Sequence, residues 1–372
     1  MDYSGQIEEF AEKACFHYDL PGLAVGAWAD EDSPAACAGT ACAAVSGYLD
    51  FPEKRPIAAD SLFHMASVSK LFVSTAVMLL AERGALDLEA PLAGYLPWLV
   101  MKDERFRDIS ARQALTHTAG FPDVLDYRWP EPEADSGALK RYLVSGEVRD
   151  AQLLWAPGEG RYRYSNLGYE ILGALTAELS GVPFEVFVDE NILKPLEMRD
   201  TTFLTWLRSA EGRAMDAESA GPETVKNALR LDALRDGGLC MPHRKDAGKH
   251  IIRREHFPYN RAHAPSSTLT SKLGDLRKFG DAHLHKKILR PESYEKLWTS
   301  CALVPNNGEH MGLGWFMRRQ NSYGLYGHEG TDDGFRASFW ICPELKLQIA
   351  VMSNLDDAPV KRINKQVFDM LT

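Results

Sequence analysis

Short apolar runs, bounded by polar residues, glycine or proline, lie near both ends of the chain. Residues 20–30 and 41–51 are rich in small and β-branched residues, and a polar, proline-containing stretch separates them. Four further runs with tight turns between them occupy residues 312–319, 322–330, 335–344 and 345–354. Runs of this length and composition predict antiparallel β-strands.

A helical period replaces this pattern in the middle of the chain. From Ser67 onward the apolar residues recur at helical spacing, and Gly84 provides a natural end to that helix. Residues 168–181 have a clear helical period that also ends on glycine. Two more helices are predicted at 270–284 and at 358–371.

Strands at both ends with helices between them predict an α/β fold of the α+β type. We expect one mixed, mainly antiparallel sheet flanked by helices and built from both chain ends, with a mainly helical lobe inserted. The predicted boundaries are 1–65 and 265–372 for the sheet lobe and 66–264 for the helical lobe. Within the helical lobe, residues 207–263 are polar and weakly periodic and predict excursion loops with short helices.

Composition limits the partners. The net charge is −10 and both signs are mixed along the chain, so the clustered basic face of a nucleic-acid binder is missing. No apolar run reaches the ~18 residues of a membrane span. The first residues lack the basic start and apolar core of a secretory signal, which predicts a cytoplasmic location. A removed leader with export is the alternative.

Cysteine and histidine spacing predicts neither metal nor cofactor. The six cysteines are scattered without C-x-x-C spacing, so we expect free thiols; a Cys37–Cys42 disulfide is the alternative. No H-E-x-x-H or Cys/His zinc pattern occurs.

Ser67 and Lys70 form the first candidate for chemistry. Three residues apart at a helix start, they share one face within side-chain reach. A serine hydroxyl needs a neighbouring base to become a nucleophile, and burial lowers the pKa of a lysine enough for that task. The alternative is a structural one, in which Ser67 caps the helix and Lys70 is solvated.

Two further elements carry polar groups, one on a loop before a helix and one at the edge of a strand. Tyr164 and Asn166 precede the helix at 168–181; near a cationic lysine the phenol should have a lowered pKa, and the amide can bond both lysine and substrate. His328 and Gly330 lie on a glycine-flanked strand, where the Thr331 N–H can serve as oxyanion donor opposite the Ser67 N–H. A rim tyrosine and a surface histidine are the alternatives.

These elements, in this order, resemble the S-x-x-K, Y-x-N and K-T-G-like motifs of the serine β-lactamase and penicillin-binding-protein superfamily. The resemblance is to its class C-like branch and covers roughly residues 20–355, including ALTHTAGFP and WAPGEGRYRYSNLGYEILG. It implies an acyl-enzyme mechanism in which Ser67 attacks a carbonyl, Lys70 and Tyr164 relay protons, and Asn166 orients. No segment resembles the loop carrying the deacylating glutamate of class A enzymes, which favours Tyr164 as base.

One departure from the family concerns charge. His328 stands where the K-T-G lysine holds a substrate carboxylate, and Glu329 follows it. This favours an esterase or amidase acting on a small molecule or peptide over a β-lactamase, unless Arg336 supplies the missing charge. The alternatives are a β-lactamase or D-alanyl-D-alanine carboxypeptidase, or a penicillin-binding sensor that does not hydrolyse. The sequence does not predict the oligomeric state.

Histidines and aromatic residues near the motifs allow other interpretations. Without a G-x-S-x-G elbow, His117 is expected to support the Tyr164 loop and not to act as a base. His64 is expected to pack. Four aromatic residues either line an acyl pocket or pack in the core: Tyr127, Trp129, Trp155 and Trp206.

Overall fold

The computed structural model describes residues 3–35, 37–209, 212 and 222–372. Its centre is a nine-stranded sheet in the order β3-β2-β1-β13-β12-β11-β10-β9-β8, with every neighbouring pair antiparallel. The strands are β1 (Gly22–Ala29), β2 (Ala41–Asp50), β3 (Arg55–Pro56), β8 (Ala302–Leu303), β9 (His310–Met311), β10 (Phe316–Gln320), β11 (Tyr323–Asp332), β12 (Phe335–Cys342) and β13 (Leu347–Ser353). Both chain ends thus contribute strands, which confirms the predicted fold class.

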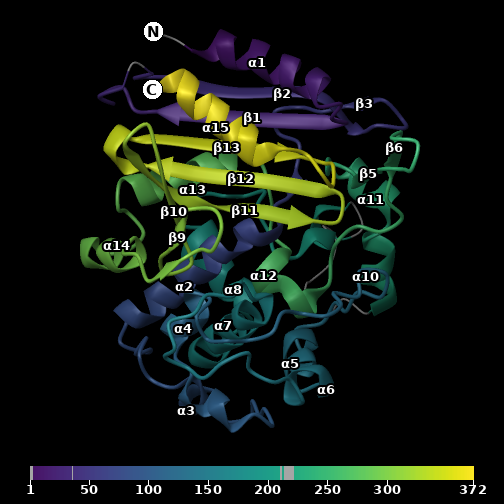
Figure 1. Cartoon of the computed structure of the whole chain (residues 1–372). Helices are drawn as coiled ribbons and strands as arrows, with labels where there is room; N and C mark the ends of the chain where they lie inside the picture. The colour runs from purple at the N-terminus through teal and green to yellow at the C-terminus, as the bar shows by residue number, and fades with distance from the viewer. Residues whose placement is uncertain (1–2, 36, 210–211, 213–221) are drawn as a thin grey trace.

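The two ends of the chain meet where β1 pairs with β13, Val25 lying opposite Val351. Alternation along β1 divides the core in two, because successive side chains of a strand point to opposite faces. Leu23 and Val25 join the cluster under the terminal helices, whereas Ala24 and Trp28 join the cluster shared with the helical part. In Figure 1 both termini accordingly lie at the same corner of the molecule.

Helices cover both faces of the sheet. Helix α1 (Ser4–His17) packs on β2 and helix α15 (Val360–Leu371) on β12 and β13, while α13 (Leu273–Leu284) packs on the opposite face. Below the sheet in Figure 1 lies the helical part, built around α2 (Ser69–Glu82) and α7 (Asn166–Ser180). Whether the chain divides at residues 66 and 265 into two lobes stays a prediction.

The remaining elements are short. The helices are α3 (Leu92–Tyr95), α4 (Ala111–Leu115), α5 (Ala138–Leu143), α6 (Gly146–Arg149), α8 (Phe184–Val188), α10 (Pro222–Ala228), α11 (Leu231–Asp236), α12 (Ala264–Ser267) and α14 (Pro291–Leu297). Two small antiparallel pairs stand outside the main sheet: β4 (Phe63–His64) with β7 (Thr270–Ser271), and β5 (His243–Lys245) with β6 (Ile251–Arg253). The predicted excursion at 207–263 falls partly outside the described residues.

Local chemistry explains where the two central helices begin and end. Ser165 caps α7 by accepting from the Gly168 N–H at 3.3 Å, so this helix starts two residues earlier than its apolar period predicts. Gly181 ends it with a left-handed φ of 75°. Helix α2 follows directly on a 3₁₀ turn, Ala66–Val68, that contains Ser67.

The structure also bears on the predictions about a disulfide and about membrane spans. Cys37 is a free thiol, so the Cys37–Cys42 disulfide is wrong. In the described part of the chain no single helix has the length and apolar character to cross a membrane; α7 and residues 184–193 pass that test only together, with a 74° bend between them.

Close packing of α7 on α12 predicts that Gly173→Ala destabilises the protein. A Cβ at Gly173 would overlap the ring of Pro265, and neither helix can give way cheaply in a packed core. We expect a loss of about 1–3 kcal/mol in the free energy of unfolding, measured by denaturant titration. Gly181→Asn, at the exposed left-handed end of the same helix, is the control with a smaller effect; equal stability of Gly173→Ala and wild type would contradict this packing.

Candidate active site

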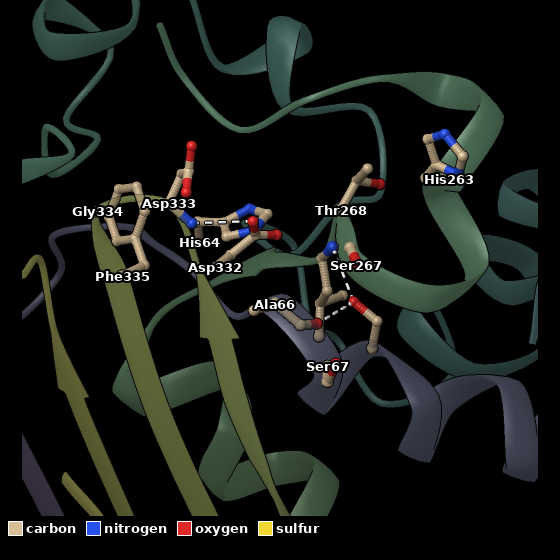
Figure 2. A network of polar contacts seen from close by, with 12 residues as sticks. His64, Ala66, Ser67, His263, Ser267, Thr268, Asp332, Asp333, Gly334 and Phe335 are labelled. Carbon is tan, nitrogen blue, oxygen red and sulfur yellow. Dashed lines mark hydrogen bonds and ion pairs between the residues drawn. The ribbon is translucent and has the colours of Figure 1, made fainter. Parts of the chain in front are cut away.

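Ser67 lies on a turn that hydrogen bonds of Ser69 stabilise. Ala66 has a left-handed φ of 47°, which is unusual for a residue with a side chain. Ser69 secures this turn: its hydroxyl donates to the Ala66 carbonyl at 2.6 Å and accepts from the Leu269 N–H at 3.1 Å. Figure 2 shows Ala66 and Ser67 on this turn. The Ser67 side chain is half-buried and lines a cavity.

Lys70 is fully buried directly beside the candidate nucleophile. Its ammonium nitrogen lies 2.9 Å from Ser67 Oγ, 2.6 Å from Asn166 Oδ1 and 2.9 Å from the Ser266 carbonyl. Burial lowers the pKa of Lys70 to about 7, because the charged form loses its hydration. The carboxylates of Glu170, Asp123 and Asp332 act in the opposite direction and limit the fall.

Asp123 fixes the orientation of Asn166. One carboxylate oxygen of Asp123 accepts from the Asn166 backbone N–H at 2.8 Å and from its side-chain Nδ2 at 3.0 Å. With the Nδ2 group held there, Oδ1 is the atom left to face Lys70. Asp123 directly follows the ALTHTAGFP block, and no motif in the sequence marked it as a site residue.

Tyr164 lies at the same point, but its acidity differs from the expectation. Lys70 Nζ is 5.1 Å from the centre of its ring, which packs against His117 and Phe316. Burial raises the pKa of Tyr164 well above its usual value, and a side-chain hydrogen bond with Ser67 offsets this only in part. The predicted lowering of the phenol pKa is therefore wrong, because desolvation outweighs the hydrogen bond with Ser67 that lowers the pKa.

His117 supports the tyrosine loop, as predicted. Its Nδ1 accepts from the Ser165 N–H at 3.1 Å, and its carbonyl accepts from the Arg163 N–H at 2.9 Å. The ring is buried, which holds its pKa well below the ordinary value, so it is neutral. These bonds place Tyr164 between two anchored residues.

Strand β11 brings the third predicted element to the site. His328 is buried with Nδ1 2.6 Å from the Glu329 carbonyl, and burial lowers its pKa to about 3, so the side chain is neutral. Glu329 accepts from Trp340 Nε1 at 2.7 Å, and burial raises its pKa. The strand thus offers no cation of its own where the family has lysine.

The end of β11 runs close to the Ser67 turn. Pairing with β10 stops at Gly327, so the last five residues of the strand extend past that neighbour. A Cβ at Gly330 would overlap the Met65 carbonyl oxygen, which explains glycine there. Thr331, the predicted oxyanion donor, follows Gly330 and lines the same cavity as Ser67.

A cavity of about 420 Å³ joins these groups. Its lining residues are Ser67, Tyr164, Asn166, Val304, Asn307, Glu309, Phe316, His328, Glu329, Thr331 and Lys361. Lys361 of α15 is the ammonium group in this lining, and it forms a 2.5 Å ion pair with Glu309. No motif marked these two residues, because they lie far from the others in the chain.

Several sequence candidates lie elsewhere. The guanidinium of Arg336 donates to the carbonyls of Asp332 and Phe335 and is not part of the cavity lining. Trp155 and Trp206 are buried in the core, and Trp129 lines two other hollows near residues 252–257. Across the described ranges, no group of three or more His, Cys, Asp or Glu residues is arranged to hold a metal.

Two curated proteins are similar to this chain in sequence. Penicillin-binding protein 4* of Bacillus subtilis is 25% identical over 293 residues, 78% of this chain. Protein flp of Staphylococcus aureus (strain MW2) is 23% identical over 322 residues, 85% of this chain. The matched region spans only 60% and 57% of those two relatives' own lengths.

Two solved structures have the same fold. The octameric penicillin-binding protein homologue from Pyrococcus abyssi superposes with a TM-score of 0.76 at 23% identity, covering 100% of this chain and 77% of its own. D-amino acid amidase from Ochrobactrum anthropi SV3, complexed with L-phenylalanine amide, gives a TM-score of 0.73 at 22% identity, covering 98% and 95%. The family model described as Beta-lactamase matches residues 6–371, and the protein therefore belongs to the beta-lactamase family.

Proposed function

We propose that this protein is a serine hydrolase that cleaves ester or amide bonds of a small molecule or peptide through an acyl-enzyme. The observation that carries the proposal is the buried Lys70 amine 2.9 Å from Ser67 Oγ, with a pKa near neutrality. An amine with such a pKa is half unprotonated at pH 7, where a solvated lysine is almost wholly charged. A lysine with a purely structural role does not need to be buried beside a serine hydroxyl with its pKa lowered to near neutrality.

In the proposed acylation, neutral Lys70 takes the proton of Ser67 while Oγ bonds to the substrate carbonyl carbon. The N–H groups of Ser67 and Thr331 stabilise the oxyanion. The tetrahedral species then collapses, and the departing oxygen or nitrogen takes a proton from Tyr164, which recovers one from Lys70. The raised pKa of Tyr164 suits this acid role, because it keeps the phenol protonated.

Deacylation repeats these steps with water in place of Ser67. Lys70 accepts a proton from the water as it adds to the acyl carbon, and Ser67 leaves with a proton returned through the same groups. The sequence favoured Tyr164 as the base, and we now propose Lys70 in that role. The reason is energetic: ionising a buried phenol with a raised pKa costs more than using an amine whose pKa is near neutral.

Charge in the cavity bears on the substrate class. His328 is neutral, and Lys361 is already paired with Glu309, while Glu329 adds a second carboxyl group to the wall. A substrate carboxylate would have to compete with Glu309 for Lys361. This favours neutral or ammonium-bearing esters and amides, a class that includes the amino acid amide bound in the similar amidase structure.

A second candidate is cleavage of β-lactams or D-alanyl-D-alanine peptides. It is favoured by the likeness to a penicillin-binding protein and by the presence of Lys361, which a substrate carboxylate could draw away from Glu309. A cephalosporin reporter tested beside amino acid amides separates the two candidates. The first predicts a higher kcat/KM for the amides.

The nucleophile assignment predicts that Ser67→Ala abolishes turnover. A panel of p-nitrophenyl esters and D- and L-amino acid p-nitroanilides is assayed with wild type and variant, and a fluorophosphonate probe reports labelling of Ser67 by mass spectrometry. We expect a loss of at least about 10⁴-fold in kcat and no label on the variant. Ser69→Ala, two residues away, is no neutral control because Ser69 holds the turn, so Ser61→Ala serves instead. Equal turnover by Ser67→Ala would overturn the function.

The lowered pKa of Lys70 predicts the pH dependence. Protonation removes the base, so kcat/KM should fall about tenfold per pH unit below about pH 7 and level off above it. The measurement is a pH–rate profile on an uncharged ester, with melting temperature recorded at each pH to show that the fold is intact. A profile flat down to about pH 5 would contradict Lys70 as base.

The contact between Asp123 and Asn166 predicts a loss of activity in Asp123→Ala. Without its carboxylate, the Asn166 amide is free to turn Nδ2 toward Lys70, so two donors would face each other. We expect kcat to fall about 10- to 100-fold with a smaller change in KM. Asp126→Ala, on the same loop, is the matched control, and wild-type kcat in Asp123→Ala would refute the role.

A further inference from the structure

A buried histidine and an aspartate connect the two halves of the proposed oxyanion hole. His64 Nε2 lies 3.0 Å from Asp332 Oδ2, and the pair is drawn as a dashed line in Figure 2. His64 precedes the nucleophile Ser67 by three residues, and Asp332 directly follows Thr331. The two residues are 268 positions apart in the chain. Their bond therefore joins the segment before the Ser67 N–H to the residue after the Thr331 N–H.

Both ends of this link are rigid. His64 belongs to β4, which pairs with β7, and its ring packs against Phe257 and Phe335. The second oxygen of the Asp332 carboxylate accepts from the Asp333 N–H at 2.9 Å. Only 1% of His64 is exposed, so it does not contact substrate.

Gly330 sets a steric limit on the approach of β11 to the Ser67 turn, in addition to the hydrogen bond between His64 and Asp332. The Met65 carbonyl fills the space that a Cβ on Gly330 would need, so strand and turn are in contact at residue 65. The glycine sets how closely β11 can approach, and the hydrogen bond keeps it from moving away. An oxyanion hole works only when its donors are held at the position of the developing charge before reaction.

We infer that His64 and Asp332 are positioning residues that fix the distance between the Ser67 and Thr331 N–H groups. This inference rests on the proposed function, because it assigns the pair a role in the same reaction. The pair acts through the backbone of its neighbours and takes no proton in the mechanism. Its loss should weaken binding of the transition state and leave substrate binding nearly unchanged.

The test uses His64→Phe, which keeps a ring packed against Phe257 and Phe335 but removes the donor. We expect kcat for the ester to fall about 10- to 100-fold with KM changed less than about 3-fold. Phenylboronic acid, which adds to Ser67 and places an oxygen in the hole, should lose affinity by a similar factor. Asp332→Ala, which removes the acceptor of the His64 bond, should lower kcat and boronate affinity by a similar factor.

A matched variant separates positioning from stability. His283 is likewise buried among aromatic rings, with one hydroxyl partner, Thr75, at 3.3 Å. His283→Phe should lower the melting temperature without altering kcat or boronate affinity. Wild-type kcat and boronate affinity in His64→Phe would overturn the inference, as would an equal loss of kcat in His283→Phe.

The two claims fail in different ways. If wild type shows no turnover and no label on Ser67, the proposed function fails and the pair's role in it falls as well. If wild type turns over and Ser67→Ala does not, the function stands, and the ratio of kcat between His64→Phe and wild type alone decides the inference.

Discussion

Burial of one ammonium group is the constraint on which the site depends. Lys70 is enclosed completely, and its three polar neighbours come from the Ser67 turn, the start of α7 and the α12 carbonyl. An isolated buried charge is costly, so the fold must either supply acceptors or let the group lose its proton. Here it does both: three acceptors surround the nitrogen, and its pKa falls to about 7. The same enclosure that lowers the pKa of Lys70 brings three segments together at its nitrogen.

The second requirement is close approach between backbone segments around the site. Glycines at two contacts permit it: Gly330 against the Met65 carbonyl, and Gly173 against Pro265 next to Ser266. The first brings β11 to Ser67, and the second brings α12 to Lys70. The geometry of the candidate site is therefore a consequence of backbone packing as much as of the polar side chains.

The sequence predicted the elements whose signal is local. Strands β1, β2 and β10–β13 and helices α2, α7, α13 and α15 have clear apolar patterns, although several of their ends differ from the prediction by a few residues. The site triplets were also visible, because three short motifs in family order identify them together. The exact lobe boundaries and the catalytic roles stay predictions.

What the sequence could not provide depends on burial and on contacts between distant segments. The direction of the Tyr164 pKa was wrong because a motif gives neighbours but not desolvation. Asp123, Glu309 and Lys361 reach the site from separate elements and carry no pattern of their own. The His64–Asp332 contact spans 268 residues and has no local signature.

The central claim concerns the protonation of Lys70, and it is most directly tested by titrating that amine. Protein labelled with ¹³C at lysine Cε is followed by NMR as pH is raised, and Lys70→Arg identifies the resonance. A signal that titrates near pH 7 is the result expected from burial beside Ser67. A Lys70 signal that titrates near 10.5, like that of a solvated lysine, would contradict the account.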